Sequence, residues 1–453
     1  MKAPWGDRDW NRVLVYGLGA SGLAATRLLR SRGVEVLGVD TRSATELDLG
    51  DLTHDVGVEV LLGTDPEVLP ANIDGVVMSP GVSLDQPLVL AARAAGLPVI
   101  AEVELAYPFA DGHVIGITGS NGKSTTTLMT GEILAAAGFG VEVCGNIGVP
   151  LSDVVEGPPG RIFVTELSSF QLESVDTFHP RAAALLNLSA DHLDRHQDAD
   201  SYFAAKERLF ASQDSSDVAV MNADDPRVEK VDVEARRREF SRQGPVDDGC
   251  YLDGDIVIEV DPAGEDRPLF CCQDLSLPGV HNLENAMAAA LLSRAIGADP
   301  TVFPQALSRF RGLPHRLQQI IDRQGVVWYD DSKATNFAAT SKSLVGFANG
   351  SVHLILGGRN KGGDPRELEV EVSRKVARVY LIGEAAEEIE AALERVAPCE
   401  MSGTMEAAVM SAANRARAGE TVVLSPSCAS FDQYRSFAAR GDHFQALVRS
   451  LDG

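Results

Sequence analysis

Short apolar runs rich in β-branched residues alternate with longer Ala- and Leu-rich stretches of helical period along the chain. This alternation is typical of parallel β-sheets covered by helices, so it predicts an α/β fold throughout. The clearest predicted helices are 21–30, 86–95 and 125–137. The predicted strands are 13–16, 34–40, 76–81 with its turn, 99–100, 114–118, 162–167, 183–188, 218–222, 326–329, 352–356, 376–382 and 421–424.

The pattern also indicates where the chain divides. Between about Cys250 and Gly279 the helical period lapses, and Gly, Asp and Pro separate short strands, which favours a small β insertion. Gly312-Leu313-Pro314 reads as a linker. A chain of 453 residues is too long for one hydrophobic core, and about 150 residues per domain suggests three domains. We predict domains at 1–101, 102–312 and 313–453.

Charge narrows the possible partners. Sixty-five acidic and forty basic residues give a formal net charge of −25, which repels nucleic acid and anionic membranes at long range. We therefore expect small-molecule partners and neither nucleic acid nor membrane. Any anionic ligand must be bound by a local group of backbone amides, cations or metal ions that overrides this field.

The cysteines and the start of the chain indicate the compartment. The six cysteines form no CxxC pair, which favours reduced thiols in a cytosolic protein over a disulfide framework. Residues 1–10 lack an apolar signal segment, and no apolar run approaches the ~20 residues that span a bilayer. Cytoplasm is the expected location, and we expect a monomer.

A glycine-rich segment follows the first predicted strand and precedes a helix. Gly17-Leu18-Gly19-Ala20-Ser21-Gly22 fits GxGxxG, and Asp40 ends the next strand at the spacing of a ribose-binding carboxylate. Alone, this pattern indicates a dinucleotide dehydrogenase. The physical requirement is broader, because such glycines let any nucleotide diphosphate approach a helix N-terminus. They also serve tight turns without a ligand.

A second glycine loop lies between the predicted strand 114–118 and the helix 125–137. In Gly116-Ile117-Thr118-Gly119-Ser120-Asn121-Gly122-Lys123-Ser124 the backbone amides can surround a β-phosphate, Lys123 can neutralise the transferred phosphoryl group, and Ser124 can bind magnesium. Ile117 stands where the general GxxxxGK[ST] pattern has its first glycine. Gly-Lys-Ser at such a junction is seldom accidental, so the loop predicts ATP binding.

The shortened loop Thr118–Ser124 resembles that of the Mur ligases, and further motifs follow in that family's order. These are Gly145-Asn146-Ile147-Gly148, Glu166-Leu167-Ser168-Ser169-Phe170-Gln171, Asn187 to Asp191-His192-Leu193-Asp194, His281-Asn282 with Asn285, Leu313-Pro314-His315-Arg316, Asp331-Ser332-Lys333-Ala334-Thr335-Asn336 and Ser425 to Ser430. They span nearly the whole chain, so the protein is identified as a member of that family. The resemblance implies a Rossmann-like UDP-substrate domain, a central ATP-binding domain with a parallel P-loop ATPase-type sheet, and a Rossmann-like amino-acid-binding domain.

Within the family, three segments are most similar to the member that adds D-glutamate to UDP-N-acetylmuramoyl-L-alanine: Asp40-Thr41-Arg42, Leu167 to Glu173 and Ser427 to Gln433. The Asp-Asn-Pro-Arg of the diaminopimelate-adding member is absent. The implied activity is ATP-dependent amide-bond formation through an acyl phosphate, with release of ADP. It belongs to peptidoglycan precursor synthesis, on which cell-wall biogenesis, cell shape and cell division depend.

The resemblance also implies site residues. The first glycine loop then holds UDP, with no nicotinamide, and the UDP-substrate residues are Gly19, Ala20, Ser21, Asp40, Thr41, Arg42, Gly81 and Asn146. The ATP residues are Gly119, Ser120, Asn121, Gly122, Lys123, Ser124, Thr125, Asn282, Asn285, Arg316 and Asp331. Asn282 and Asn285 share one helix face, where they can present amides to the nucleotide, although capping or surface polarity is the alternative.

Two magnesium ions are implied, held by Ser124, Glu166, His192 and Lys206. Glu166 ends a strand near the nucleotide loop, where a carboxylate is a natural magnesium ligand, although a salt bridge is the alternative. A lone His192 would more often be structural. By spacing Lys206 is a solvated surface lysine; the resemblance implies instead that it is carbamylated and that its carbamate oxygens bind magnesium. Lys123, His192 and Lys206 are the implied catalytic residues.

The incoming D-glutamate is implied to contact cations and hydroxyl or amide donors, which suit a carboxylate-bearing amino acid. The matching positions are Lys333, Thr335, Lys361, Ser430, Phe431 and Phe437. Three rivals remain: another ligase of the superfamily, which adds a different amino acid or extends a folate; an NAD-dependent oxidoreductase; and a catalytically silent nucleotide-binding regulator. The second leaves Gly119 to Ser124 without a role, and intact Lys123, Glu166, His192 and Lys206 argue against the third.

Overall fold

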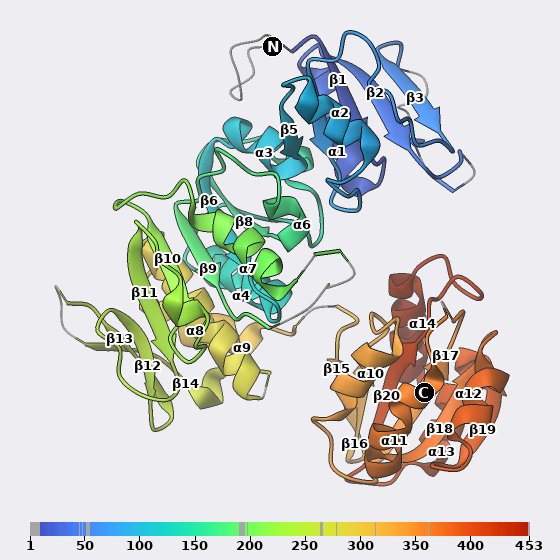
Figure 1. Ribbon diagram of the computed structural model, residues 1–453. Helices are drawn as coiled ribbons and strands as arrows, with labels where there is room; N and C mark the ends of the chain where they lie inside the picture. Colours follow the sequence, from blue (N-terminus) through green and yellow to red (C-terminus); the bar gives the residue numbers. More distant parts are fainter. Residues whose placement is uncertain are drawn as a thin grey trace. The chain divides into compact units, whose positions relative to one another are not determined.

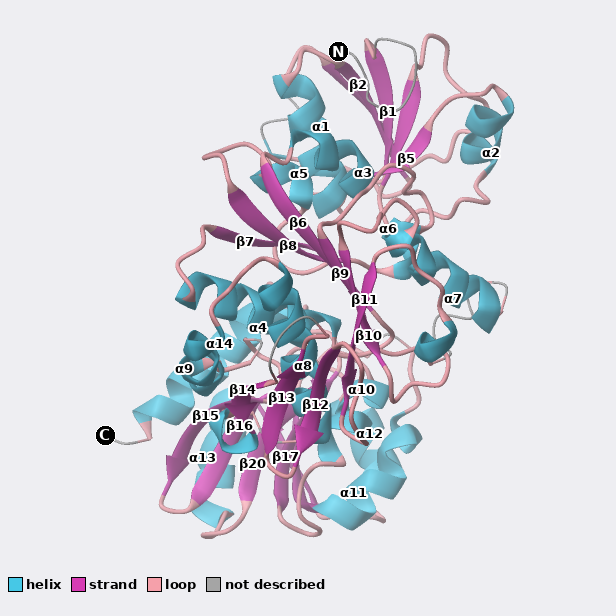
Figure 2. Ribbon diagram, turned by 90° about the vertical axis from the view of Figure 1, so that its left-hand side faces the viewer, coloured by secondary structure: helices cyan, strands magenta, loops and turns pink. Residues whose placement is uncertain are grey.

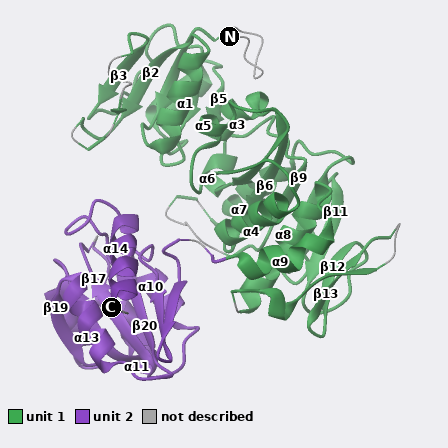
Figure 3. Cartoon of the chain, turned by 180° about the vertical axis from the view of Figure 1, so that it is seen from behind, with its two compact units in different colours: residues 1–310 green, residues 311–453 purple. Residues whose placement is uncertain are grey.

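Three parallel or mostly parallel sheets follow one another along the chain (Figure 1). The computed structural model describes residues 10–44, 46–47, 49–50, 55–189, 195–196, 198–262, 266–277, 279–312, 314–360 and 362–451. The chain forms two compact units, residues 1–310 with the first two sheets and residues 311–453 with the third (Figure 3). The α/β fold predicted throughout is confirmed. Among the described residues, no helix combines the length and the apolar character needed to cross a bilayer.

The first sheet is entirely parallel, in the order β3-β2-β1-β4-β5. Its strands are β1 (Arg12–Tyr16), β2 (Glu35–Asp40), β3 (Val58–Leu62), β4 (Gly75–Met78) and β5 (Val99–Ala101), with helices α1 (Ala20–Ser31) and α2 (Pro87–Ala94). Val13 and Val15 of β1 share one cluster with α1, whereas Leu14 and Tyr16 share another with α2. Alternate residues of β1 therefore face opposite helices, which buries the strand on both sides.

The second sheet has nine strands, in the order β14-β13-β12-β11-β10-β9-β6-β8-β7. They are β6 (Gly112–Thr118), β7 (Val141–Gly145), β8 (Arg161–Glu166), β9 (Ala182–Leu185), β10 (Val218–Asn222), β11 (Arg236–Ser241), β12 (Gly249–Asp253), β13 (Ile256–Val260) and β14 (Arg267–Cys271). The predicted β insertion exists as β12–β14, and it extends the parallel sheet, because β12 pairs with β11 and then antiparallel with β13.

Helices α4 (Lys123–Ala136) and α8 (Val280–Ala295) pack against each other on this sheet (Figure 2). The unit's other helices are α3 (Glu102–Ala106), α5 (Leu151–Val154), α6 (Ser169–Leu172), α7 (Ala199–Glu207) and α9 (Phe303–Arg309), with short 3-10 turns η2 (Tyr107–Phe109), η3 (Arg208–Phe210), η4 (Val228–Lys230), η5 (Cys272–Asp274) and η6 (Pro300–Val302).

The third sheet has the order β15-β16-β20-β17-β18-β19, antiparallel only between β15 and β16. Its elements are β15 (Gln318–Arg323), β16 (Val326–Asp330), α10 (Phe337–Leu344), β17 (Val352–Gly357), η7 (Pro365–Leu368), α11 (Glu369–Lys375), β18 (Val376–Ile382), α12 (Ala386–Leu393), β19 (Cys399–Gly403), α13 (Met405–Arg415), β20 (Thr421–Ser427) and α14 (Phe437–Ser450). Two apolar clusters form its core.

The domain boundaries at 101/102 and 312/313 stay predictions. Strand β5 ends at Ala101 and α3 begins at Glu102, while the two compact units meet at residues 310 and 311. Leu313, in the middle of the predicted linker, lies outside the described residues.

Helix α3 connects the first two sheets through two buried glutamates. Glu104 accepts hydrogen bonds from the backbone N–H groups of Asp176, Thr177 and Phe178 and from the Thr177 hydroxyl. Glu102 accepts only the Ser152 N–H at 2.6 Å, and its Oε2 has no hydrogen-bond partner among the described residues. Burial, opposed by the bond from Ser152, raises the pKa of Glu102 to about 7.

Replacing Glu102 by Gln should therefore stabilise the protein at pH 8. The folded state holds the Glu102 proton more tightly than the unfolded state, so this group's stabilisation is full below pH 4.5 and fades as pH rises through about 7. A gain of up to about 3 kcal/mol at pH 8, vanishing near pH 4, is the upper bound for this shift. Thermal unfolding at both pH values measures it. Glu104→Gln is the contrast, since it should destabilise at both; an equal effect of Glu102→Gln at both pH values would contradict the prediction.

Candidate functional site

The first glycine loop lines a cavity of about 400 Å³ at the carboxyl end of the first sheet. Glycine is required at residue 22, because a Cβ there would lie 1.8 Å from the Gly17 carbonyl oxygen. Gly19 precedes α1 without any side-chain cap, so the first N–H groups of the helix face the loop. Every predicted UDP-substrate residue except Asn146 lines this cavity: Gly19, Ala20, Ser21, Asp40, Thr41, Arg42 and Gly81.

Asp40 holds this loop in shape. Its Oδ2 accepts the Leu18 N–H at 2.7 Å, and both carboxylate oxygens accept the Arg42 side chain, at 2.9 and 2.7 Å. Burial alone would raise the pKa of Asp40, but the hydrogen bonds from Arg42 and from the Leu18 N–H outweigh it and lower the pKa to about 2. The carboxylate thus fixes both the glycine loop and the half-exposed Arg42 guanidinium.

The second glycine loop joins β6 to α4. Gly122 precedes the helix with a φ of 84°, and a Cβ there would lie 2.3 Å from Asn285 Oδ1, so conformation and space both require glycine. Lys123 Nζ donates to the carbonyl oxygens of Gly119 and Ser120, at 2.9 and 3.0 Å. The lysine therefore lies folded over the loop whose phosphate it is predicted to neutralise.

A neighbouring segment fixes the loop from outside. The predicted strand 183–188 is wrong in its last three residues, because β9 ends at Leu185. Asn187 leaves the sheet to accept the Asn121 N–H with its side chain, at 2.8 Å, and the Ser120 N–H with its carbonyl, at 2.9 Å. Ser120 Oγ donates to the Ser189 carbonyl at 2.8 Å. These bonds explain why the segment departs from strand geometry at the phosphate loop.

Lys206 is not the solvated surface lysine that its spacing predicts. The side chain is 1% exposed, on α7. Its Nζ donates to the Gly119 carbonyl at 3.0 Å and lies 4.5 Å from the centre of the Tyr202 ring, whose hydroxyl reaches Ser120 Oγ at 3.3 Å. The structure thus brings Lys206 and Lys123 to the same carbonyl oxygen.

Glu166 ends β8 next to β6, beside the start of the phosphate loop. Its Oε1 accepts Asn146 Nδ2 at 2.7 Å, while Oε2 is buried with no hydrogen-bond partner among the described residues. An orphaned buried carboxylate oxygen fits a cation ligand better than the alternative salt bridge. His192, another of the four predicted magnesium ligands, lies outside the described residues.

Asn285 is buried on α8 and touches the phosphate-loop helix. Its Oδ1 accepts the Thr126 hydroxyl at 3.2 Å. Asn282 lies one turn earlier on α8, partly exposed. Ser124 and Thr125 occupy the first turn of α4, where N–H groups have no partner within the helix.

The second unit gathers predicted residues at the carboxyl end of β16. Asp331 is buried, and its carboxylate accepts the hydroxyls of Ser343 and Ser425, each at 2.7 Å, and the Leu317 N–H at 3.1 Å. Burial, partly offset by these hydrogen bonds, raises the pKa of Asp331 to about 6. Arg316 is exposed, between two residues of positive φ, His315 and Leu317.

The predicted amino-acid residues lie on three segments that the structure joins. Lys333 Nζ lies 5.9 Å from the centre of the Phe437 ring, which begins α14. Thr335 is partly exposed, Ser430 is buried and Phe431 is 61% exposed. Lys361 lies outside the described residues.

Sequence reasoning missed Arg440, which ties these segments together. It is 1% exposed and donates to Ser332 Oγ and the Ser332 carbonyl, both at 2.9 Å, and to the Cys428 carbonyl at 3.0 Å. Burial lowers its pKa to about 10. Its only sequence signal is a helical position one turn after Phe437, which any surface arginine shares.

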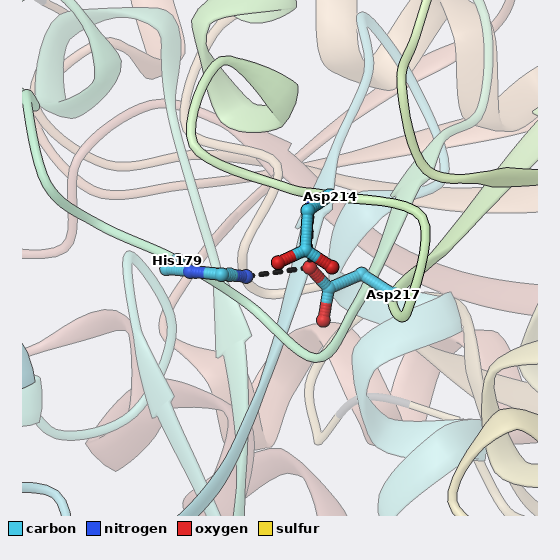
Figure 4. Close-up of side chains that lie close together, drawn as sticks. All are labelled: His179, Asp214 and Asp217. Atoms are coloured by element: carbon cyan, nitrogen blue, oxygen red, sulfur yellow. Dashed lines mark hydrogen bonds and ion pairs between the residues drawn. The ribbon is translucent and has the colours of Figure 1, made fainter.

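His179, Asp214 and Asp217 form a separate group of possible metal ligands (Figure 4). Asp217 already accepts the Asp214 N–H at 2.9 Å and Arg181 Nη1 at 3.3 Å, besides His179. The group lies at the amino ends of β9 and β10, whereas ligands of parallel sheets bind at the carboxyl ends. These contacts fit a group that closes the turn before β10.

Comparison with known proteins matches all three parts of the chain to models of one family. Residues 11–101 match the Mur ligase MurD-like N-terminal domain, residues 117–293 the Mur ligase middle domain, and residues 315–428 the Mur ligase glutamate ligase domain. The chain belongs to the Mur ligase family. The resemblance predicted from the motifs is thereby confirmed, and the protein is a ligase.

Relatives match over almost the full length. UDP-N-acetylmuramoylalanine–D-glutamate ligases of Koribacter versatilis and Acidobacterium capsulatum are 43% and 41% identical, over 97% and 98% of this chain and 97% of each relative. Among solved structures, UDP-N-acetylmuramate–alanine ligase of Thermotoga maritima has a TM-score of 0.59 at 17% identity, covering 98% of this chain and 100% of that one. The solved structure supports the three-domain fold alone.

Proposed function

We propose that the protein joins D-glutamate to UDP-N-acetylmuramoyl-L-alanine in an ATP-dependent reaction of peptidoglycan precursor synthesis. The observation that carries this proposal is 43% identity, over 97% of both chains, to the UDP-N-acetylmuramoylalanine–D-glutamate ligase of Koribacter versatilis. Two nucleotide-type glycine loops in one compact unit agree with it, because the reaction needs a UDP-linked acceptor and ATP together. A nicotinamide enzyme would need only the first loop. We expect the enzyme to act as a monomer in the cytoplasm.

The first glycine loop is the proposed UDP site. The N-terminus of α1 and the Arg42 guanidinium offer positive charge to a diphosphate. Gly19, Ala20, Ser21, Thr41 and Gly81 line the cavity, and Asp40 keeps Arg42 and the loop in place. Asn146, held by Glu166, lies toward the phosphate loop and is proposed to contact the acceptor's far end.

Substituting Asp40 by Ala should raise the KM for the UDP substrate about tenfold and leave that for ATP within about twofold, the shift expected when a charged hydrogen-bonding group is lost. The change frees Arg42 and the Leu18 N–H, whereas none of the proposed ATP residues belongs to the first sheet. Steady-state ADP formation with each substrate varied in turn measures both constants. Equal changes in the two would argue that the first sheet does not hold UDP.

In the proposed first step, a carboxylate oxygen of the acceptor attacks the γ-phosphorus of ATP, the bond to ADP breaks, and an acyl phosphate forms. Lys123 is placed to offset the repulsion between these anions. The D-glutamate amine then attacks the acyl carbon; phosphate leaves with the bond electrons, and the nitrogen loses a proton. Water must be excluded throughout, because an acyl phosphate hydrolyses.

ATP and magnesium are the cofactors of the Mur ligase family. Bound Mg²⁺ adds positive charge that offsets phosphate repulsion. We propose that Ser124, Glu166, His192 and Lys206, the last as its carbamate, hold two such ions; the buried Oε2 of Glu166 fits this role. Gly119, Ser120, Asn121, Gly122, Thr125, Asn282, Asn285, Arg316 and Asp331 are proposed to complete the ATP site, and Lys333, Thr335, Lys361, Ser430, Phe431 and Phe437 that of D-glutamate.

ADP formation with a panel of acceptors and amino acids tests the proposal. We expect turnover only when UDP-N-acetylmuramoyl-L-alanine, D-glutamate, ATP and Mg²⁺ are all present. Preference for L-alanine, for another amino acid or for a folate acceptor would assign the protein to another ligase of the superfamily. Binding of a nicotinamide nucleotide without any ligation would favour an oxidoreductase instead.

A further inference from the structure

One arginine, located between β9 and α7, reaches the wall of the proposed UDP cavity. Arg195 follows the phosphate-loop segment that contains Asn187 in sequence, yet its Nη1 donates to the Pro80 carbonyl at 3.1 Å and its Nη2 to the Val82 carbonyl at 2.7 Å. Pro80, Gly81 and Val82 all line the cavity. A single guanidinium therefore grips the backbone on both sides of Gly81.

The same guanidinium is anchored on its own side. Nη2 also contacts Glu173 Oε2 at 3.1 Å, and the guanidinium carbon lies 4.6 Å from the centre of the Phe170 ring. The Arg195 and Glu173 side chains are only 15% and 16% exposed. A largely buried ion pair of this kind fixes the position of the guanidinium better than a solvent-exposed pair does, because water screens its charges less.

Aromatic contacts continue from this anchor to the phosphate loop. Phe170 stacks on the His196 ring at 5.6 Å between centres, and His196 meets the edge of Tyr202 at 5.2 Å. Tyr202 contacts Ser120 of the loop through its hydroxyl and Lys206 through its ring. A chain of contacts thus connects the wall of the UDP cavity to the loop residues that are proposed to bind phosphate.

We infer that Arg195 is a positioning residue, which fixes the Pro80–Val82 wall of the UDP cavity relative to the phosphate loop and so aligns the acceptor's carboxylate with ATP. The identity of the acceptor rests on the proposed function. Among the described residues, the Arg195 side chain contacts Pro80, Val82, Glu173 and Phe170, none of which belongs to either glycine loop, so its effect passes through the two carbonyl groups that it holds.

Arg195→Ala should loosen this wall selectively. In the full-length enzyme we expect the KM for UDP-N-acetylmuramoyl-L-alanine to rise about tenfold, equivalent to about 1.4 kcal/mol, with the KM for ATP within about twofold of wild type. Amide hydrogen exchange of the ligand-free protein should be faster at residues 79–83. Arg195→Lys should raise the KM and the exchange rate less than Arg195→Ala does, because an ammonium group still donates to carbonyl oxygens. It should not match the wild type, because it lacks the planar fork of the guanidinium.

Three further variants separate a positioning role from an effect on overall stability. Arg27→Ala is the matched control, since Arg27 on α1 also pairs across the two sheets of this unit, with Asp153 at 2.8 Å, yet lines no part of the UDP cavity. It should leave the UDP-substrate KM and exchange at 79–83 near wild type. Glu173→Gln should reproduce part of the Arg195→Ala effect, and the double variant should be no worse than Arg195→Ala alone.

Unchanged KM and unchanged exchange in Arg195→Ala would overturn the inference, as would equal changes in both KM values or an equal loss in Arg27→Ala. If Arg195→Ala does not fold, Arg195→Lys and Glu173→Gln decide in the same way. If the wild type does not turn over the UDP substrate, the proposed function fails, and faster or unchanged exchange at 79–83 alone then supports or overturns the positioning role.

Discussion

Lys123→Ala should lose about a thousandfold or more of the rate of ADP formation while its melting temperature stays within a few degrees of wild type. A preorganised charge in a phosphoryl-transfer site is commonly worth a hundredfold to a thousandfold or more. Lys123 Nζ rests on the Gly119 and Ser120 carbonyls, inside the loop and outside the apolar clusters. Its loss would remove positive charge at the proposed γ-phosphate site and little packing.

The control for Lys123→Ala is a lysine outside the proposed phosphate site. Lys230, exposed at the end of η4 in the same unit, provides it, and Lys230→Ala should keep wild-type turnover and melting temperature. ADP release and thermal unfolding are measured on both variants. Near-normal phosphate release by Lys123→Ala would show that the loop is wrongly assigned; a large fall in melting temperature would show that Lys123 has a structural role.

Most buried parallel strands could be predicted from sequence, whereas most edge strands could not; the edge strand β5, predicted at 99–100, is an exception. Strands β10 and β18 have the predicted bounds, because mostly apolar runs, interrupted in β18 by Arg378, mark strands buried on both faces. The missed strands β3, β7, β15 and β19 all lie at sheet edges, where partial exposure breaks the run. Strand β11 was missed for another reason: Arg238 is buried there, paired with Asp248 and Glu259, although three consecutive arginines read as surface.

Some residues of the candidate site could likewise be predicted from sequence, whereas others could not. Local loops such as Gly17–Gly22 and Gly119–Ser124 carry their geometry in their own residues, so sequence was sufficient to find them. Arg195 and Arg440 bind backbone carbonyls more than a hundred residues away, at Pro80 and Ser332. Every residue has a backbone carbonyl group, so the sequence does not indicate which of them accepts a hydrogen bond from an arginine. Only the fold brings these partners together.

Lys206 shows why a resemblance and a structure are both needed. Sequence spacing predicts a surface lysine, yet the residue is buried beside Lys123, with both Nζ atoms about 3 Å from the Gly119 carbonyl oxygen. Two ammonium groups so placed repel each other, and both repel a divalent cation. Carbamylation combines the neutral amine with carbon dioxide and releases a proton. On Lys206, the proposed carbamate would replace a cation by an anion with two acceptor oxygens, which would attract Lys123 and magnesium instead of repelling them.

Lys206→Ala should therefore be nearly inactive, with a loss of about a thousandfold, and formate or acetate should restore part of the activity by supplying the missing carboxylate oxygens. Lys206→Arg should not recover, because it keeps a positive charge and does not form the carbamate. Carbon-13 NMR of the wild type in labelled bicarbonate should show a carbamate resonance that both variants lack. Lys123→Ala is the control for rescue, since formate cannot replace a lost cation. An active Lys206→Arg enzyme, or equal rescue of Lys123→Ala by formate, would show that Lys206 does not act as a carbamate.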